Sequence, residues 1–189
     1  MATDARARMI GSMQRMLQTK GYAASGLIEL VADSHAPKGS IYHHFPGGKE
    51  ELAAAAIRVS GAEAAAATAR ALAGTRTPAA GVRLILDWLS NQLATSNYRY
   101  GCPIATTTLE IASESDVVQQ ACAEAYAAWH AAIADRLIAD GRKRRSADDA
   151  ATLVLAAMEG ALILCRAQCS VRPLKVLADN VSALLDSPR

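Results

Sequence analysis

Alanine is the residue type that most restricts how this chain can fold, because the 189 residues include 42 alanines and only 8 aromatic side chains. Alanine is the strongest helix former, whereas aromatic and β-branched residues favour sheets. Because 51% of the residues are hydrophobic, the chain also has enough apolar material for a core. The composition therefore predicts an all-α protein of one or two domains.

Glycine and proline residues divide the chain into about nine expected helices. Glycine commonly follows the last turn of a helix, and proline is favoured in the first turn, where its missing N–H is not needed. Between these residues, apolar side chains recur at helical spacing. The expected helices are 4–20, 26–34, 38–44, 49–72, 78–96, 103–112, 115–140, 146–167 and 173–185.

Serine residues are expected to cap three of these helices. Ser25 and Ser115 each precede a helix, and a serine hydroxyl can accept a hydrogen bond from the first N–H groups of a helix. Ser146 is followed three residues later by Asp149, a spacing that resembles a capping box.

Neither a membrane span nor a signal peptide is expected. The most apolar stretch, residues 150–165, is short for a bilayer core and carries Glu159, so it predicts a helix buried inside the protein. The first ten residues carry Asp4, Arg6 and Arg8 and lack the apolar segment of a signal peptide. The expected location is therefore the cytoplasm.

The four cysteines, Cys102, Cys122, Cys165 and Cys169, lack the paired spacing of a zinc site or a disulfide framework. We expect reduced, mostly buried thiols, with no metal site and no cofactor. Because Cys165 and Cys169 lie four residues apart on one helix, a redox switch is the alternative.

The net charge of +2 is concentrated near the N-terminus. The first fifty residues contain six basic and four acidic side chains, whereas the remaining 139 contain fourteen of each sign. The total charge is too small to indicate nucleic-acid binding, but its distribution divides the chain into a short polar head and a long alanine-rich body.

Two short helices joined by a tight turn, 26–34 and 37–44, match the helix-turn-helix motif, whose second helix enters the DNA major groove. Ile41 and Phe45 are expected to point into the core. Several residues here can contact phosphates or bases. They are the polar side chains, a glycine that allows close backbone approach, and a lysine at the start of the following helix. The expected DNA-binding residues are Ser25, Lys38, Gly39, Ser40, Tyr42, His43 and Lys49.

The segment GYAASGLIELVADSHAPKGSIYHHFPGGKEEL, residues 21–52, resembles the DNA-binding segment of TetR-family transcriptional regulators. The run APKGSIYHHFPGGKEEL, together with GCPIATTTLE at 101–110, resembles the subgroup related to lincomycin-resistance and quercetin-responsive repressors. In two places the chain departs from the family pattern. His35 stands where the turn commonly has glycine, and Gly26 where Ser or Thr is common. Since His35 can adopt a left-handed backbone at some cost, the departure concerns the geometry of the turn.

The resemblance implies an all-helical homodimer with a three-helix DNA-binding head and a body that binds a small ligand. It places the helix-turn-helix domain at 1–48, with the motif at about 26–45, and the ligand-binding and dimerisation domain at 49–189. It also implies that the last two long helices form the dimer interface, which agrees with the apolar residues on several sides of helix 146–167.

Large apolar side chains stand out in the alanine-rich body, and a few polar ones could orient a bound molecule. For any one of them, a place in the ordinary helical core is the alternative. The expected ligand-binding residues are Trp88, Cys102, Thr106, Leu109, Glu110, Tyr126, Trp129, His130, Met158 and Leu162.

The densest basic run, Arg142–Arg145, is expected in a solvated loop between two body helices rather than at the DNA. The sequence therefore predicts a DNA-binding repressor, released from a palindromic operator by a small hydrophobic or aromatic ligand. The alternatives are an activator, a small-molecule-binding protein that does not regulate DNA, and an enzyme that uses the body pocket. No catalytic motif is evident, so no enzyme activity is expected.

Overall fold

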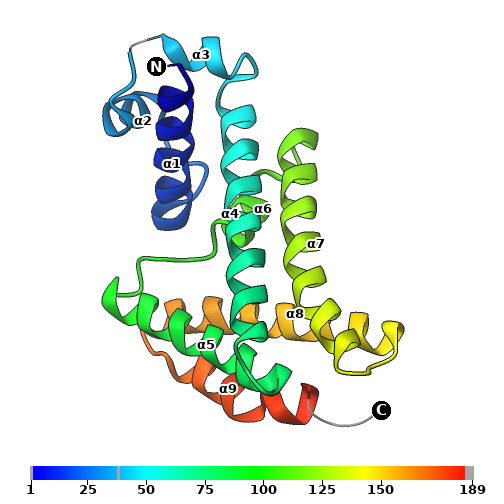
Figure 1. Cartoon of the computed structure of the whole chain (residues 1–189). Coiled ribbons are helices and arrows are strands. Elements are labelled where there is room, and N and C mark those ends of the chain that lie inside the picture. The colour runs from blue at the N-terminus through cyan, green and yellow to red at the C-terminus, as the bar shows by residue number, and fades with distance from the viewer. Residues whose placement is uncertain (1, 38, 186–189) are drawn as a thin grey trace. The chain divides into compact units, whose positions relative to one another are not determined.

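The computed structural model describes residues 2–37 and 39–185, with side chains from residue 5 onward. Within these residues the chain forms helices and no strands (Figure 1), so the predicted all-α class is confirmed. The nine helices of the described part are α1 (Ala2–Lys20), α2 (Leu27–Ser34), α3 (Ser40–His44), α4 (Gly48–Ala73), α5 (Pro78–Thr95), α6 (Pro103–Ile111), α7 (Asp116–Ala139), α8 (Arg144–Gln168) and α9 (Arg172–Leu185).

The helices divide between two compact units. Unit 1 comprises the chain up to Gly61 together with Cys102–Tyr126, and unit 2 comprises Ala62–Gly101 and the chain from Ala127 onward. Unit 1 therefore holds α1, α2, α3 and α6 and the first parts of α4 and α7. Unit 2 holds α5, α8 and α9 and the remaining parts of α4 and α7.

In unit 1, an apolar stripe of α1 forms the core of the first three helices. Met9, Met13 and Leu17 recur at helical spacing and are completely buried, as are Leu30 of α2 and Phe45 after α3. Small residues pack the helices closely elsewhere in this unit. A Cβ atom built on Gly61 of α4 would lie 2.4 Å from the Cβ of Ala125 in α7, so only glycine permits this approach.

In unit 2, α8 packs against α9 and α5, and its buried side chains fill the core. Among the described helices, α8 alone has the length and composition to span a membrane. Its inward face, including Val154, Met158 and Cys165, is buried in the unit, as expected for a core helix.

One expected helix cap and one expected helix start are wrong. Gly26 is the N-cap of α2 without a side-chain cap, so Ser25 is not the capping residue. The recognition helix α3 begins at Ser40 rather than at residue 38, because Gly39 has a left-handed backbone with φ of +87°. Ser40 N–H bonds the carbonyl of Pro37 instead, at 3.1 Å, and forms a turn.

The expected capping box at the start of α8 is also wrong. Gly141, with φ of +93°, ends the preceding helix, and Lys143 is the N-cap of α8. The helix thus starts before Ser146, and the expected loop at Arg142–Arg145 is correspondingly shorter, with Arg144 and Arg145 in the first turn of α8. The Arg142 guanidinium donates to the carbonyls of Leu184 and Leu185 at the end of α9, at 3.3 and 2.9 Å, so that part of the run stabilises a helix end.

Candidate DNA-binding surface and candidate ligand-binding residues

The turn between α2 and α3 has the backbone that the motif requires. His35 is the C-cap of α2 in a left-handed conformation, with φ of +50°, and its N–H bonds the carbonyl of Ala32. The left-handed conformation expected at His35 is therefore confirmed. Below the turn, Ile41 and Phe45 are buried, as expected, and they anchor α3 to the core.

The outer side of α3 carries the candidate DNA contacts. Tyr42 is 63% exposed, and His43 and Gly39 are also exposed. Ser40 is half-buried, and its hydroxyl donates to the carbonyl of Pro37 at 2.7 Å. Lys38 lies outside the described residues. The structure thus brings Gly39, Tyr42 and His43 together on one accessible helix face.

Lys49 and Ser25 make contacts within the protein. The Lys49 ammonium lies 4.1 Å from the centre of the Tyr22 ring and 3.5 Å from the carbonyl oxygen of Ala23. Burial lowers the pKa of the Lys49 ammonium, and the nearby Glu110 carboxylate opposes that shift. Ser25 is fully buried, and its hydroxyl donates to the carbonyl of Gly21 at 2.5 Å. Ser25 therefore offers no exposed hydroxyl to a phosphate.

Glu110 binds the same turn of unit 1. Its Oε2 accepts a hydrogen bond from the backbone N–H of Ala23 at 2.7 Å. A Cβ atom on Gly21, where φ is +80°, would lie 2.1 Å from the other carboxylate oxygen. This carboxylate was expected to orient a ligand, and no sequence signal indicated its backbone partner 87 residues away.

The ten expected ligand-binding residues divide equally between the units. Cys102, Thr106, Leu109, Glu110 and Tyr126 belong to unit 1, and Trp88, Trp129, His130, Met158 and Leu162 belong to unit 2. In unit 1, Leu109 is 77% exposed, Tyr126 is half-buried, and Thr106 donates its hydroxyl to the carbonyl of Cys102 at 3.0 Å. These side chains thus differ in their exposure within the unit.

In unit 2, Met158 and Leu162 are buried in the core, whereas Trp88 is 58% exposed. Trp129 is buried and donates its indole N–H to the hydroxyl of Thr68 at 2.8 Å. The ring nitrogen Nε2 of His130 lies 3.0 Å from the carbonyl oxygen of Asp148. The polar atoms of Trp129 and His130 are therefore engaged by the unit itself.

Thr107 of α6 is a candidate site residue that no sequence pattern indicated. Its side chain is completely buried, and its hydroxyl has no hydrogen-bond partner among the described residues. A buried polar group without a partner costs free energy, so this hydroxyl is available to a bound polar group or water.

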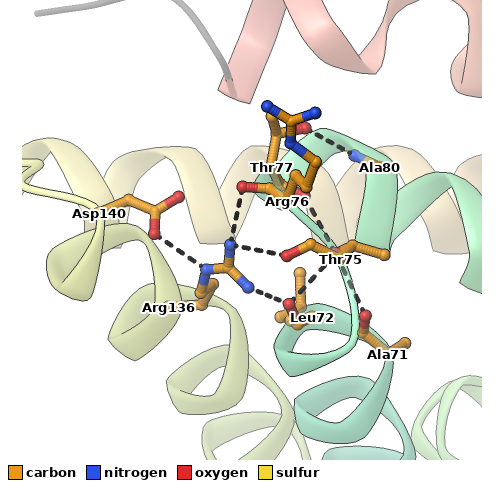
Figure 2. Close-up of polar contacts among 8 residues, drawn as sticks. All are labelled: Ala71, Leu72, Thr75, Arg76, Thr77, Ala80, Arg136 and Asp140. Carbon is orange, nitrogen blue, oxygen red and sulfur yellow. Dashed lines mark hydrogen bonds and ion pairs between the residues drawn. The ribbon is translucent and has the colours of Figure 1, made fainter.

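Arg136 of α7, which no sequence pattern singled out, holds the end of α4 (Figure 2). Its guanidinium donates to the carbonyl of Leu72 and to those of Thr75 and Arg76, at 3.2 and 3.3 Å for the latter two. Asp140 accepts from Nε at 3.0 Å. One side chain thereby satisfies a carbonyl of the last turn of α4, that of Leu72, and two carbonyls of the turn that follows.

On the outer side of α8, apolar side chains remain exposed. Leu153, Ile163 and Leu164 of α8 and Val176 of α9 are each at least half exposed. Gly160 lies on the same side, and a Cβ atom there would meet no other atom within 4 Å. Such a surface, with a small residue among apolar ones, has the composition of a helix-packing interface.

A helix-turn-helix with a buried inner side and an exposed polar outer side, followed by a long helical region, defines a DNA-binding transcriptional regulator. The comparisons identify the family. The family model described as bacterial regulatory proteins, tetR family, matches residues 14–56, and the model described as transcriptional regulator LmrA/YxaF-like, C-terminal domain, matches residues 78–180. This chain therefore belongs to the TetR family of transcriptional regulators, with a C-terminal region of the LmrA/YxaF type.

Relatives and solved structures agree with this assignment. The HTH-type transcriptional regulator LmrA of Bacillus subtilis is 31% identical over 96% of this chain and 97% of its own length. The uncharacterised regulator YxaF of the same organism is 29% identical over 96% and 95%. A TetR regulator of Chloroflexus aurantiacus has a TM-score of 0.77 at 26% identity, covering 96% of this chain and 94% of its own. Escherichia coli NemR in its reduced form shares the fold, with a TM-score of 0.82 at 21% identity over 97% and 98%.

Proposed function

We propose that this protein is a cytoplasmic repressor that binds a palindromic operator as a homodimer and is released by a small hydrophobic or aromatic ligand. The proposal assigns DNA binding to residues 1–48, ligand binding and dimerisation to 49–189, and no catalytic role to either region. The observation that carries it is the two-sided recognition helix, in which Ile41 is buried while Tyr42 and His43 are exposed.

Two copies of α3 would enter successive major grooves about 34–36 Å apart, one turn of DNA. The proposed contacts are Ser40, Tyr42 and His43 of that helix, Lys38 and Gly39 before it, and Lys49. Because Lys49 already contacts Tyr22 and Ala23, its contact with a phosphate requires that the ammonium be shared or released.

DNA binding is tested by fluorescence anisotropy with the DNA upstream of the protein's own gene and a shuffled duplex of equal length. We expect tight binding to the first duplex only, with affinity that falls as salt rises. Tyr42→Phe should weaken binding by removing a hydroxyl donor, whereas Tyr100→Phe, an exposed tyrosine of unit 2, is the matched control. Equal affinity for both duplexes would contradict the proposed repressor function.

The dimer is proposed to form through the exposed apolar side of α8 together with α9. Ile163→Glu places a charge on that side and should yield monomers in sedimentation velocity. Leu84→Glu is the matched control, because Leu84 of α5 is also 53% exposed and lies outside the proposed interface. Equal dissociation of both variants would contradict this interface.

The ligand is proposed to bind in the body, and the unpartnered hydroxyl of Thr107 supports a polar contact there. Coupling of about 1–3 kcal/mol between ligand and DNA suffices for a 5- to 150-fold change in affinity. A thermal-shift screen of planar aromatic compounds, followed by DNA release with each hit, tests this proposal. Hits that raise the melting temperature but leave DNA bound would contradict a ligand-released repressor.

A further inference from the structure

Both polar backbone atoms of Ala23, in the turn between α1 and α2, are bound by charged side chains from later helices. Glu110 of α6 accepts from the N–H at 2.7 Å, and the ammonium of Lys49 in α4 lies 3.5 Å from the carbonyl oxygen. Lys49 also lies over the ring of the preceding Tyr22. A single residue of this turn is therefore held from two helices outside the helix-turn-helix.

The turn is shaped to receive the Glu110 carboxylate. Gly21 has no side chain, and the carboxylate occupies the space in which a Cβ atom would lie, with Oε1 2.1 Å from that position. The left-handed backbone of Gly21, with φ of +80°, directs the chain so that the N–H of Ala23 meets Oε2. Gly21 and Glu110 thus fit one another sterically as well as through hydrogen bonding.

The turn leads directly into the helix-turn-helix. Ser25 closes it from within, because its hydroxyl donates to the carbonyl of Gly21 and its N–H donates to the carbonyl of Tyr22. Gly26 then caps α2, the first helix of the motif. Displacement of Ala23 would therefore change the direction in which α2 and, after it, the recognition helix leave the turn.

We propose that Glu110 is a positioning residue for operator binding, and that α6 fixes the orientation of the helix-turn-helix through the backbone of Ala23. This inference rests on the proposed DNA-binding function. Glu110 acts through the turn and does not itself contact DNA. The pair formed by Glu110 and the N–H of Ala23 is called the Glu110 latch below.

Whether a substitution of Glu110 weakens or strengthens DNA binding distinguishes a positioning role from a simple charge effect. Removal of a negative charge from a DNA-binding unit strengthens phosphate binding in general. Removal of a positioning residue weakens binding to the operator. Glu110→Ala is therefore expected to lower affinity for the upstream DNA about 10-fold or more, the value of one charged hydrogen bond, without weakening binding to shuffled DNA.

Two further variants separate the hydrogen bond from the charge. Glu110→Gln removes the charge but keeps an acceptor at the same reach, so it should retain most of the operator affinity. Glu110→Asp keeps the charge but shortens the side chain by one methylene, so it should behave like Glu110→Ala. Glu114→Ala, which removes an exposed acid from the same unit, is the matched control and should leave operator affinity unchanged or slightly tighter.

Amide hydrogen exchange of Ala23 in the DNA-free protein tests the latch independently of DNA binding. We expect protection in the wild type and in Glu110→Gln, and loss of protection in Glu110→Ala and Glu110→Asp. Equal exchange in all four proteins, or operator affinity unaffected by Glu110→Ala, overturns the inference. If the wild-type protein shows this protection but fails to select the upstream DNA, the proposed function fails while the latch stands.

Discussion

Two turns of this protein, one in each unit, are held by a charged side chain from a distant helix. In unit 1, Glu110 accepts from the backbone N–H of Ala23 shortly before α2 begins. In unit 2, Arg136 donates to carbonyls where α4 ends. In both turns a charged side chain binds backbone atoms, a carboxylate the N–H of Ala23 and a guanidinium the carbonyls after α4. The two contacts therefore follow the same principle with opposite charges.

The Arg136 and Glu110 contacts differ in how strongly they hold their turns. The Arg136 side chain is only 18% exposed and has three carbonyls and Asp140 as partners. Glu110 is exposed, and its carboxylate accepts a hydrogen bond from a single backbone group, the N–H of Ala23. A contact with several shielded partners costs much more to open than a single exposed one. The α4–α5 turn therefore has a structural clamp, whereas the turn before the DNA-binding motif has a latch that opens at low cost.

Arg136→Met should have the largest effect on stability. It leaves the carbonyls of Leu72, Thr75 and Arg76 without their donor, so we expect the free energy of unfolding to fall by about 2–3 kcal/mol. Urea denaturation followed by circular dichroism measures this change. Arg76→Met is the control, because Arg76 contributes its carbonyl rather than its side chain to the clamp. If both variants lose the same stability, Arg136 is not a clamp.

Gly21→Ala should have the next largest effect, because it strains the latch from the side of the turn. A left-handed backbone costs alanine about 1–2 kcal/mol, and the new Cβ displaces the Glu110 carboxylate. Thermal unfolding of Gly21→Ala, Glu110→Ala and the double variant measures the coupling. We expect the double variant to lose less than the sum of the single losses, since the steric conflict is then gone.

Gly11→Ala in α1 is the control for a glycine without such constraints. Its Cβ would meet only the Arg15 guanidinium, at an ordinary 3.6 Å, so alanine should stabilise the helix by about 0.5–1 kcal/mol. Strict additivity of Gly21→Ala and Glu110→Ala would contradict the fit between the carboxylate and the turn.

Local sequence signals predicted most of the helices and the form of the helix-turn-helix. Pro78 and Pro103 start helices as expected, and His35 adopts the left-handed backbone that its place in the turn requires. The expected caps at Ser25 and Ser146 are wrong because neighbouring residues, rather than the nearest serines, cap α2 and α8. The Ser25 hydroxyl donates to the carbonyl of Gly21 and Gly26 caps α2, whereas Gly141 ends α7 and Lys143 caps α8. Gly39, with positive φ, sets the start of α3.

The roles of Glu110 and Arg136 were not predictable from local patterns. Their partners are backbone groups 87 and 60 to 64 residues away, and a backbone N–H or C=O has no residue type that a sequence can display. The proposed ligand contacts share this difficulty. A polar or aromatic residue among alanines has the same sequence signal whether it faces a ligand or, as for Trp129 and Thr68, another side chain of the core.

His35→Gly should have a smaller effect, and a stabilising one, because this turn needs only a left-handed residue. Glycine adopts φ of +50° without the cost that histidine bears, so we expect a gain of about 0.5–1 kcal/mol. Cys169→Gly is the matched variant in unit 2, where Cys169 caps α8 with φ of +45°. Similar gains in melting temperature for the two variants would show that both caps have the same preference for a left-handed residue. The units would then differ in their long-range contacts and not in these caps. A loss at His35 alone would indicate that its side chain supports the motif.

The smallest expected effect is a pH dependence of the contact between α1 and α2. Asp33 accepts from the Ser12 hydroxyl at 2.5 Å and from Arg15 at 2.6 Å, and these hydrogen bonds hold the pKa of its carboxyl below the ordinary value of an aspartate. A lowered folded-state pKa stabilises the protein above the unfolded value, and this contribution is lost as pH falls through the folded-state pKa. Asp33→Asn should therefore be less stable than the wild type at neutral pH, with a difference that narrows only below about pH 4.

The Asp33 contribution should be small because both partners of its ion pair are largely exposed, with side chains 47% and 62% accessible. Chemical denaturation at a series of pH values measures the difference between the two proteins. A difference that stays constant down to acid pH would mean that the carboxylate charge contributes nothing. The contact between α1 and α2 would then depend on buried apolar residues such as Met13, Leu17 and Leu30, together with its other polar contacts, the Lys20–Glu29 ion pair and the hydrogen bond from Arg8 to the carbonyl of Ser34.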